Sequence, residues 1–123
     1  KNYKPDRVYT HFLSDLNIDH RITAEATITA FRPLPRENCT EVLSFEIASS
    51  TDLMKRKFAP NYFVDISRTI NAKIKALSFY KSEMRKSPHP RSLNNIKAMS
   101  AFRGKQLGVK FAEAFEVIRI LEK

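Results

Sequence analysis

Glycine and cysteine are both scarce in this sequence of 123 residues. Its two glycines, Gly104 and Gly108, are too few for a phosphate-binding loop or a dinucleotide-binding motif, because those need several for tight turns and close backbone approach. The single cysteine, Cys39, excludes an internal disulfide framework and a cysteine-rich zinc site. It also fits a reducing compartment, so we expect a cytoplasmic protein.

Long apolar runs and a signal-like N-terminus are absent as well. No run approaches the ~20 apolar residues of a membrane-spanning helix, and the first residues lack the pattern of a secretory signal. Apolar residues still make up 42% of the chain, enough for a packed core. We therefore expect residues 1–123 to form one domain or part of one. The chain starts at Lys1 rather than methionine, so we expect a fragment or a processed product.

Acidic residues are in the minority, since 22 Lys and Arg against 13 Asp and Glu give a net charge of +9. The basic residues are spread along the chain, mostly on predicted solvent-exposed helix faces. No motif that interleaves them with aromatics for RNA or DNA binding is present. Nucleic acid is therefore not the favoured partner. A basic, non-catalytic α/β module for nucleic acid or another anionic partner remains the alternative function.

The stretch from Asp15 to Arg21 concentrates polar chemistry. It holds two carboxylates, an amide, an imidazole and a guanidinium, directly after a short apolar run and His11. Open α/β sheets build their sites where strands end, and Asp and His are suitable zinc ligands. The alternative is a helix start capped by Asn17 or Asp19. The local pattern leaves both interpretations open.

Alternating or short apolar runs predict four strands, at residues 7–10, 43–47, 62–66 and 110–121. Residues 22–31 are ambiguous, because their apolar residues alternate as in a strand while their alanines favour a helix; we predict a helix that ends before Pro33. A second helix is predicted after a cap at Asp65 or Ser67. Its apolar stripe comprises Ile70, Ile74, Leu77 and Met84, and its opposite face carries Lys73, Lys75, Lys81 and Arg85.

A third helix is predicted from a Ser92 cap to about Leu107. Its expected inward residues are Ile96, Met99 and Phe102. Gly104 is unfavourable inside a helix, which predicts that another part of the backbone approaches it closely. Gly108 is a natural helix terminator.

The segment 87–92 separates the last two helices. Pro88 and Pro90 restrict the backbone around His89, and Arg91 follows. A His and an Arg held in a rigid loop suit a contact to an anion or a sugar. The alternative is a simple turn between helices.

Several stretches, taken together and in order, resemble one family, the LmbE-like or PIG-L deacetylases. These zinc-dependent enzymes remove acetyl groups from N-acetylglucosamine-type conjugates. The resemblance implies an α/β fold, part of a Rossmann-like three-layer sandwich with a mostly parallel sheet. It is carried by Val8-Tyr9-Thr10-His11, the stretch from Asp15 to Arg21, Phe63-Val64-Asp65-Ile66-Ser67, Ala76-Leu77, Tyr80-Lys81-Ser82, His89-Pro90-Arg91-Ser92, Arg103-Gly104, Gly108-Val109 and Ala112-Glu113-Ala114-Phe115.

The family's His-Pro-Asp-Asp segment has no counterpart, since the only His-Pro pair, His89-Pro90, continues with Arg91. That segment supplies two zinc ligands and the general base, so the resemblance covers only the C-terminal part of a deacetylase. It implies that His20 is the one zinc ligand in this chain. The other ligands are expected from the missing N-terminal portion. We expect the isolated chain to be inactive and to bind zinc weakly.

The resemblance also implies roles for neighbouring residues. Asp19 is the expected polar neighbour of the zinc ligand, and Asn17 stands where many relatives have a catalytic His. Because Asn cannot transfer a proton, His11 is the expected substitute, with His89 as an alternative. The expected substrate contacts are His89, Arg91 and Glu113.

The expected substrate is an acetamido-sugar conjugate, nucleotide-linked or lipid-linked. A third interpretation is a degenerate family member that serves as a structural or assembly piece. A sheet edge left open by the missing strands would promote homo-oligomers.

Overall fold

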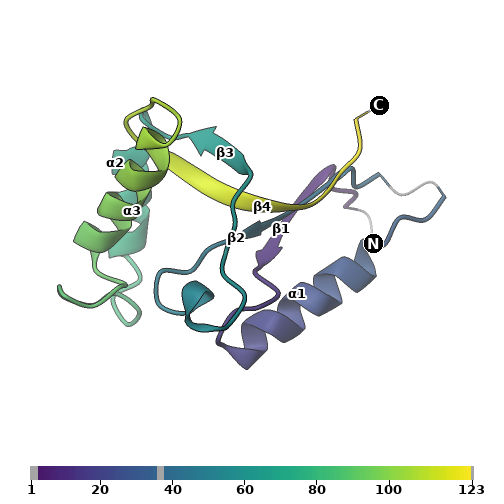
Figure 1. Ribbon diagram of the computed structural model, residues 1–123, viewed down its shortest axis with the longest axis horizontal. Helices are drawn as coiled ribbons and strands as arrows, with labels where there is room; N and C mark the ends of the chain where they lie inside the picture. The colour runs from purple at the N-terminus through teal and green to yellow at the C-terminus, as the bar shows by residue number, and fades with distance from the viewer. Residues whose placement is uncertain (1–2, 36–37, 123) are drawn as a thin grey trace. The chain divides into compact units, whose positions relative to one another are not determined.

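The computed structural model describes residues 3–35 and 38–122, which contain four strands, three α-helices and one 3-10 turn. The strands form one mixed sheet in the order β1-β2-β4-β3. In chain order the elements are β1 (Arg7–His11), α1 (Ile18–Ala30), β2 (Glu41–Phe45), η1 (Thr51–Leu53), β3 (Tyr62–Asp65), α2 (Ile70–Ser78), α3 (Leu93–Lys105) and β4 (Ala112–Ile120) (Figure 1). The predicted α/β class is confirmed.

The chain divides into two compact units, residues 1–62 with 115–123 and residues 63–114. Strands β3 and β4 each contribute residues to both. In the first unit, β1 runs parallel to β2, with Arg7 opposite Glu41 and His11 opposite Phe45. Strand β2 runs antiparallel to β4. The resemblance implied a mostly parallel sheet for the complete fold, whereas the strands described here form a mixed one, because β4 runs back along β2.

The core of the first unit lies around β2. This strand has neighbours on both sides, so its middle residues Val42, Leu43 and Ser44 are all buried. Helix α1 packs against β1 (Figure 1) through a face that includes the fully buried Ala24. The helix prediction for this ambiguous segment is confirmed, but the helix starts at Ile18 rather than at residue 22. The strand predicted at 43–47 lies at 41–45.

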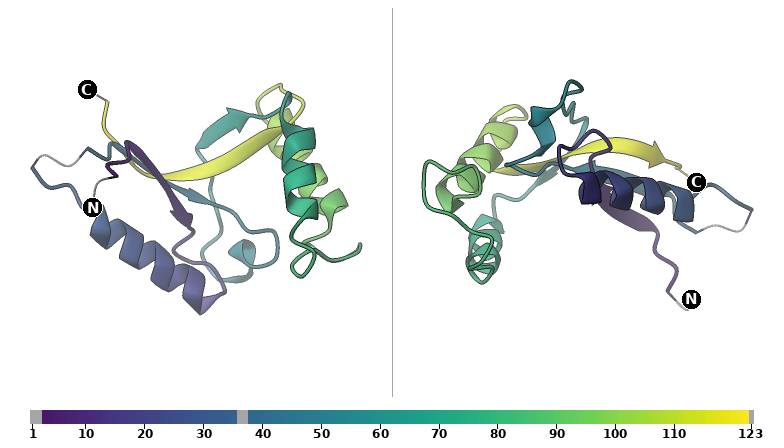
Figure 2. Two further views of the ribbon diagram at one scale, coloured as in Figure 1. Left: turned by 180° about the vertical axis from the view of Figure 1, so that it is seen from behind. Right: turned by 90° about the horizontal axis from the view of Figure 1, so that it is seen from below.

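In the second unit, α2 and α3 pack side by side (Figure 2). Helix α3 begins at the predicted Ser92 cap, whose hydroxyl accepts the Asn95 N–H at 3.2 Å. It ends in a Schellman motif around Gly108, which has a φ of 74°. There the Val109 N–H donates to Gly104 C=O and the Gly108 N–H donates to Lys105 C=O. Both glycine predictions are thus confirmed, because a Cβ on Gly104 would lie 2.7 Å from the Phe111 nitrogen.

Three predictions for this unit are wrong. Helix α2 ends at Ser78, so Met84 is not part of it. Met84 belongs to a separate turn, in which its N–H donates to Tyr80 C=O. Phe102 is 60% exposed, because Ser100 and Gly104 form the buried side of α3. Neither predicted residue caps α2; the Asp65 carboxylate instead accepts the N–H and the hydroxyl of Ser67.

None of the helices in residues 3–35 and 38–122 combines the length and apolar character that a bilayer crossing requires.

Candidate histidine and carboxylate site

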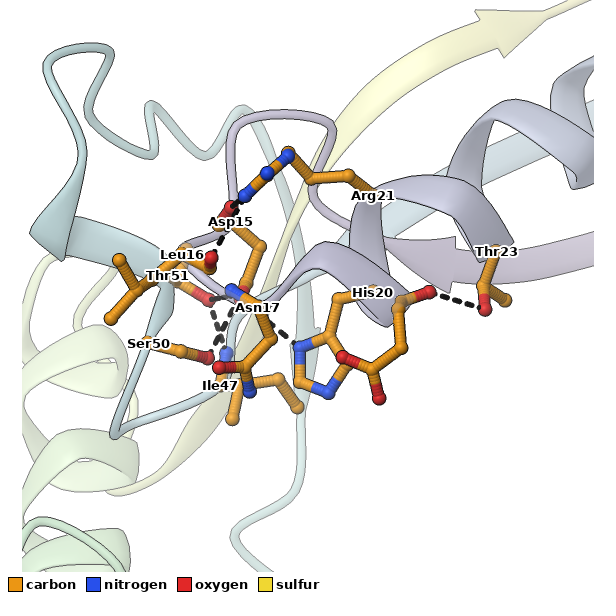
Figure 3. A network of polar contacts seen from close by, with 10 residues as sticks. Asp15, Leu16, Asn17, His20, Arg21, Thr23, Ile47, Ser50 and Thr51 are labelled. Atoms are coloured by element: carbon orange, nitrogen blue, oxygen red, sulfur yellow. Dashed lines mark hydrogen bonds and ion pairs between the residues drawn. The ribbon is translucent and has the colours of Figure 1, made fainter.

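The polar stretch after β1 is organised around Asp15, whose side chain is fully buried. Its Oδ1 accepts the Asn17 N–H at 2.9 Å and lies 3.1 Å from Nδ1 of His20. Its Oδ2 accepts the hydroxyls of Ser50 and Thr51, both at 3.0 Å. Figure 3 shows this carboxylate between the start of α1 and the segment that follows β2. Two loops at the carboxyl ends of parallel strands therefore meet at one buried anion.

Asp15 also organises the start of α1. The N-cap position belongs to Asn17, but its side chain makes no capping bond. The expectation that Asn17 or Asp19 caps the helix is therefore wrong for the side chains. The guanidinium of Arg21 reaches back to the carbonyls of Asp15 and Leu16 at 2.7 and 2.8 Å (Figure 3). Side-chain bonds from Asp15 and from Arg21 in α1 thus fix the loop between β1 and α1.

The carboxylate of Asp15 is stabilised in its charged form. Burial by itself would raise the pKa of Asp15. The donors from Asn17, Ser50 and Thr51, together with the charge of His20, outweigh burial and hold that pKa below its ordinary value. Asp15 is therefore an anion at neutral pH, and its partners must act as donors.

His20 lies in the first turn of α1, and 18% of its side chain is exposed. Its ring stacks on that of His11, the last residue of β1, with centroids 4.0 Å apart and planes 8° from parallel. On the Nε2 side the ring has no hydrogen-bond partner in the described part of the chain. The structure thus brings together two of the residues predicted for the site, His11 and His20.

His11 is the more enclosed of the two imidazoles. It lies 4.8 Å from the ring of Phe45 on β2, and its buried Nδ1 has no hydrogen-bond partner among the residues described. Burial, and then the neighbouring His20, lower the pKa of His11, while the carboxylates of Asp15 and Asp19 oppose them. The ring is therefore neutral at pH 7, where it can accept a proton.

These side chains do not by themselves fit zinc. A zinc ion needs at least three converging protein ligands. Imidazole lone pairs lie in the ring plane, so the parallel rings of His11 and His20 direct theirs side by side. Both oxygens of Asp15 are already occupied. In the described parts of the chain, no three His, Cys, Asp or Glu residues form a group that could hold a metal. His20 remains the single candidate ligand.

Asn17 and Asp19 are both exposed at the start of α1. The backbone carbonyl of Asp19 accepts the Thr23 hydroxyl at 2.7 Å. The carboxylate of Asp19 acts on His11 through its charge. It is Asp15, and not Asp19, that contacts the ring of His20.

The predicted substrate contacts lie in the second unit. Nδ1 of His89 accepts the Arg91 N–H at 3.0 Å, and Arg91 pairs with Glu83 at 2.6 Å. Glu113, on β4, pairs with Lys73 of α2 at 2.6 Å. Lys73, predicted on the solvent face of α2, is only partly exposed, since 31% of its side chain is accessible in this pair. His89 and Arg91 share one turn, as expected.

Sequence reasoning included Asp15 only as one carboxylate of the polar stretch, and it assigned no role to Ser50 or Thr51. A signal for them was present, because the polar residues 49–52 follow β2 as the Asp15 stretch follows β1. Loops after adjacent parallel strands meet at one edge of the sheet. The sequence alone did not show that β1 and β2 are paired, so it did not bring the two loops together.

No family model matches the sequence. The structure is similar to the conserved protein TT1542 from Thermus thermophilus, with a TM-score of 0.75 and 22% identity, over 98% of this chain and 55% of that one. It is also similar to an N,N'-diacetylchitobiose deacetylase from Pyrococcus horikoshii, with a TM-score of 0.67 and 21% identity, over 94% of this chain and 46% of that one. The chain thus shares the fold of about half of each structure.

Proposed function

We propose that this chain is part of an LmbE-like, or PIG-L, N-deacetylase that hydrolyses the acetamide of a sugar conjugate. The observation that carries the proposal is the position of His20. The ring stacks on His11 at the carboxyl end of β1. It also contacts a buried carboxylate, as metal-ligating histidines commonly do. The shared fold with a diacetylchitobiose deacetylase supports the same reaction class.

In this proposal His20 is one zinc ligand, and the remaining ligands come from outside this chain. Bound zinc would lower the pKa of its water and polarise the acetamide carbonyl. Residues 1–123 would form a single partial domain within a three-layer sandwich. The lone Cys39 supports a reducing, cytoplasmic setting.

The residues of this chain divide the remaining work. His11, neutral and stacked on His20, is the proposed proton carrier. Asn17 is exposed and offers a hydrogen-bond donor, and Asp19 biases His11 by its charge. His89, Arg91 and Glu113 are the proposed contacts to a nucleotide-linked or lipid-linked acetamido sugar. Arg91 suits the phosphate of such a conjugate.

Acetate release tests the proposal. The complete protein that contains this chain is incubated with N-acetylglucosamine derivatives, and the released acetate is measured. We expect His20→Ala to abolish release, and His11→Ala to lower kcat by about 100-fold or more. The matched control is Thr23→Ala, one turn further along α1. Release no higher in the wild type than in His20→Ala would contradict the enzymatic function.

The distribution of charge favours a second function, a basic module that binds an anionic partner. Residues 63–114 contain 11 Lys and Arg but three Asp and Glu, so this unit carries +8 of the net +9. Two of its acids, Glu83 and Glu113, are already paired. The test is a titration with random duplex and single-stranded nucleic acid. Binding that weakens steeply with added salt would support this function, and no binding at low salt would exclude nucleic acid.

A further inference from the structure

Each oxygen of Asp15 is occupied by two partners, and those partners restrict one another. Oδ2 receives the hydroxyls of Ser50 and Thr51. The Thr51 oxygen itself accepts the Ile47 N–H at 2.6 Å, so its proton is directed to Asp15. Oδ1 receives the backbone N–H of Asn17. The carboxylate is thereby fixed in the loop before His20 is considered.

The remaining bond determines where the proton of His20 lies. An ionised carboxylate can only accept hydrogen bonds. The 3.1 Å contact between Asp15 Oδ1 and His20 Nδ1 therefore needs a hydrogen on Nδ1. In a neutral imidazole the other nitrogen, Nε2, then carries the lone pair. Stacking on His11 fixes the plane of the ring, and the bond to Asp15 fixes its rotation within that plane.

We propose that Asp15 is a positioning residue, which holds His20 as the Nδ1–H tautomer and leaves Nε2 as its free nitrogen. The inference rests on the proposed function, because it assigns the atom through which His20 would serve a metal. Ser50 and Thr51 donate to the same carboxylate from the loop after β2. Residues of two loops therefore fix Asp15, and through it the orientation of the His20 ring. Asp19, the adjacent carboxylate, has no part in it.

His89 provides an internal reference for the other neutral tautomer, in which Nε2 carries the hydrogen. Its Nδ1 accepts the Arg91 N–H at 3.0 Å, so this nitrogen carries no proton. A neutral His89 must therefore be the Nε2–H tautomer. One spectrum of one sample should show the two histidines in opposite tautomers.

Nitrogen-15 NMR tests the proposal on the metal-free chain at mildly alkaline pH. Long-range proton–nitrogen correlations identify which ring nitrogen carries the hydrogen. In the wild type we expect Nδ1–H for His20 and Nε2–H for His89. Asp15→Ala should move His20 toward Nε2–H without changing His89. The matched control, Asp19→Ala, should change neither.

A wild-type His20 protonated on Nε2 would overturn the proposal, and so would a tautomer shift in Asp19→Ala. Both results remain decisive if Asp15→Ala fails to fold. In the complete protein, Asp15→Ala should also weaken zinc binding by about 10–100-fold. The tautomer measurement needs no turnover. The positioning role of Asp15 and the deacetylase function can therefore be disproved independently of each other. Opposite tautomers without acetate release would retain the positioning role and remove the deacetylase.

Discussion

At Gly104 the backbone of α3 lies against the chain that enters β4. A Cβ there would lie 2.7 Å from both the Phe111 nitrogen and the Val109 oxygen. Alanine normally stabilises a helix interior by about 1 kcal/mol over glycine. Because the overlap is with backbone atoms, Gly104→Ala should instead lower the free energy of unfolding by about 1–3 kcal/mol. Urea denaturation followed by circular dichroism measures this change.

Gly108 is the matched control, since nothing lies within 4 Å of its added Cβ while its φ is +74°. Gly108→Ala should lose about 1–2 kcal/mol through backbone strain alone. Asn tolerates this conformation, so Gly108→Asn should recover part of that loss. A stabilising Gly104→Ala would show that the contact with residues 109–111 does not form in solution.

At the entry to α2, we expect the carboxylate of Asp65 to make the free energy of unfolding depend on pH. The hydroxyl and then the N–H of Ser67 lower the pKa of Asp65. A lowered folded-state pKa means that the stabilisation is fully present above the ordinary Asp pKa of ~3.9 and is lost as pH falls through the folded value. Asp65→Asn should therefore be less stable than the wild type at neutral pH and equal to it in strong acid.

A double-mutant cycle separates this bond from general acid effects. In a Ser67→Ala background the hydroxyl donor is gone, so the destabilisation that Asp65→Asn causes at neutral pH should shrink. Chemical denaturation at several pH values provides the free energies. An unchanged destabilisation in that background would assign the effect to charges elsewhere, such as the neighbouring Arg68.

At the scale of elements, two helices of equal length begin in different ways. The Ser92 hydroxyl caps α3 directly, whereas α1 relies on Asp15 and not on its N-cap side chain. Ser92→Ala should therefore lower the free energy of unfolding by about 1 kcal/mol. Asn17→Ala should change it by less than about 0.5 kcal/mol. Thermal or urea unfolding of both variants provides the comparison, and equal losses would contradict it.

The same elements show how far the sequence could predict the structure. Local rules identified the Ser92 cap, the Gly108 end of α3 and the strand at β1, because those features depend on neighbouring residues. Those rules did not predict the exposure of Phe102, since it follows from packing through Ser100 and Gly104. They did not predict the role of Asp15 either, because Ser50 and Thr51 are 35 and 36 residues away. Such contacts depend on which strands pair, and spacing does not reveal that.

For the whole chain, zinc affinity follows from the number of ligands. With His20 as the single candidate, we expect the isolated chain to bind zinc more weakly than micromolar. Removing that ligand in His20→Ala should abolish the remaining interaction. Isothermal titration calorimetry measures both, with Thr23→Ala as the control. Tight 1:1 binding unchanged by His20→Ala would count against the proposed site.

The outer edge of β1 is a predicted site of self-association. This strand ends the sheet, and no other strand in residues 3–35 and 38–122 lies beside its outer side. Unpaired backbone groups on such an edge attract a second strand. We therefore expect reversible association, with an average mass that rises with concentration in sedimentation velocity. Tyr9, 45% exposed on β1, allows a direct test, because an edge lysine opposes pairing.

Tyr9→Lys should lower the association constant by about 10-fold, equivalent to roughly 1.4 kcal/mol. Tyr3→Lys adds the same charge at a residue that is 86% exposed and lies outside the strand, so it is the matched control. If both variants weaken association equally, general repulsion between positively charged chains explains the effect. A monomer at every concentration would show that the edge of β1 is protected in the isolated chain.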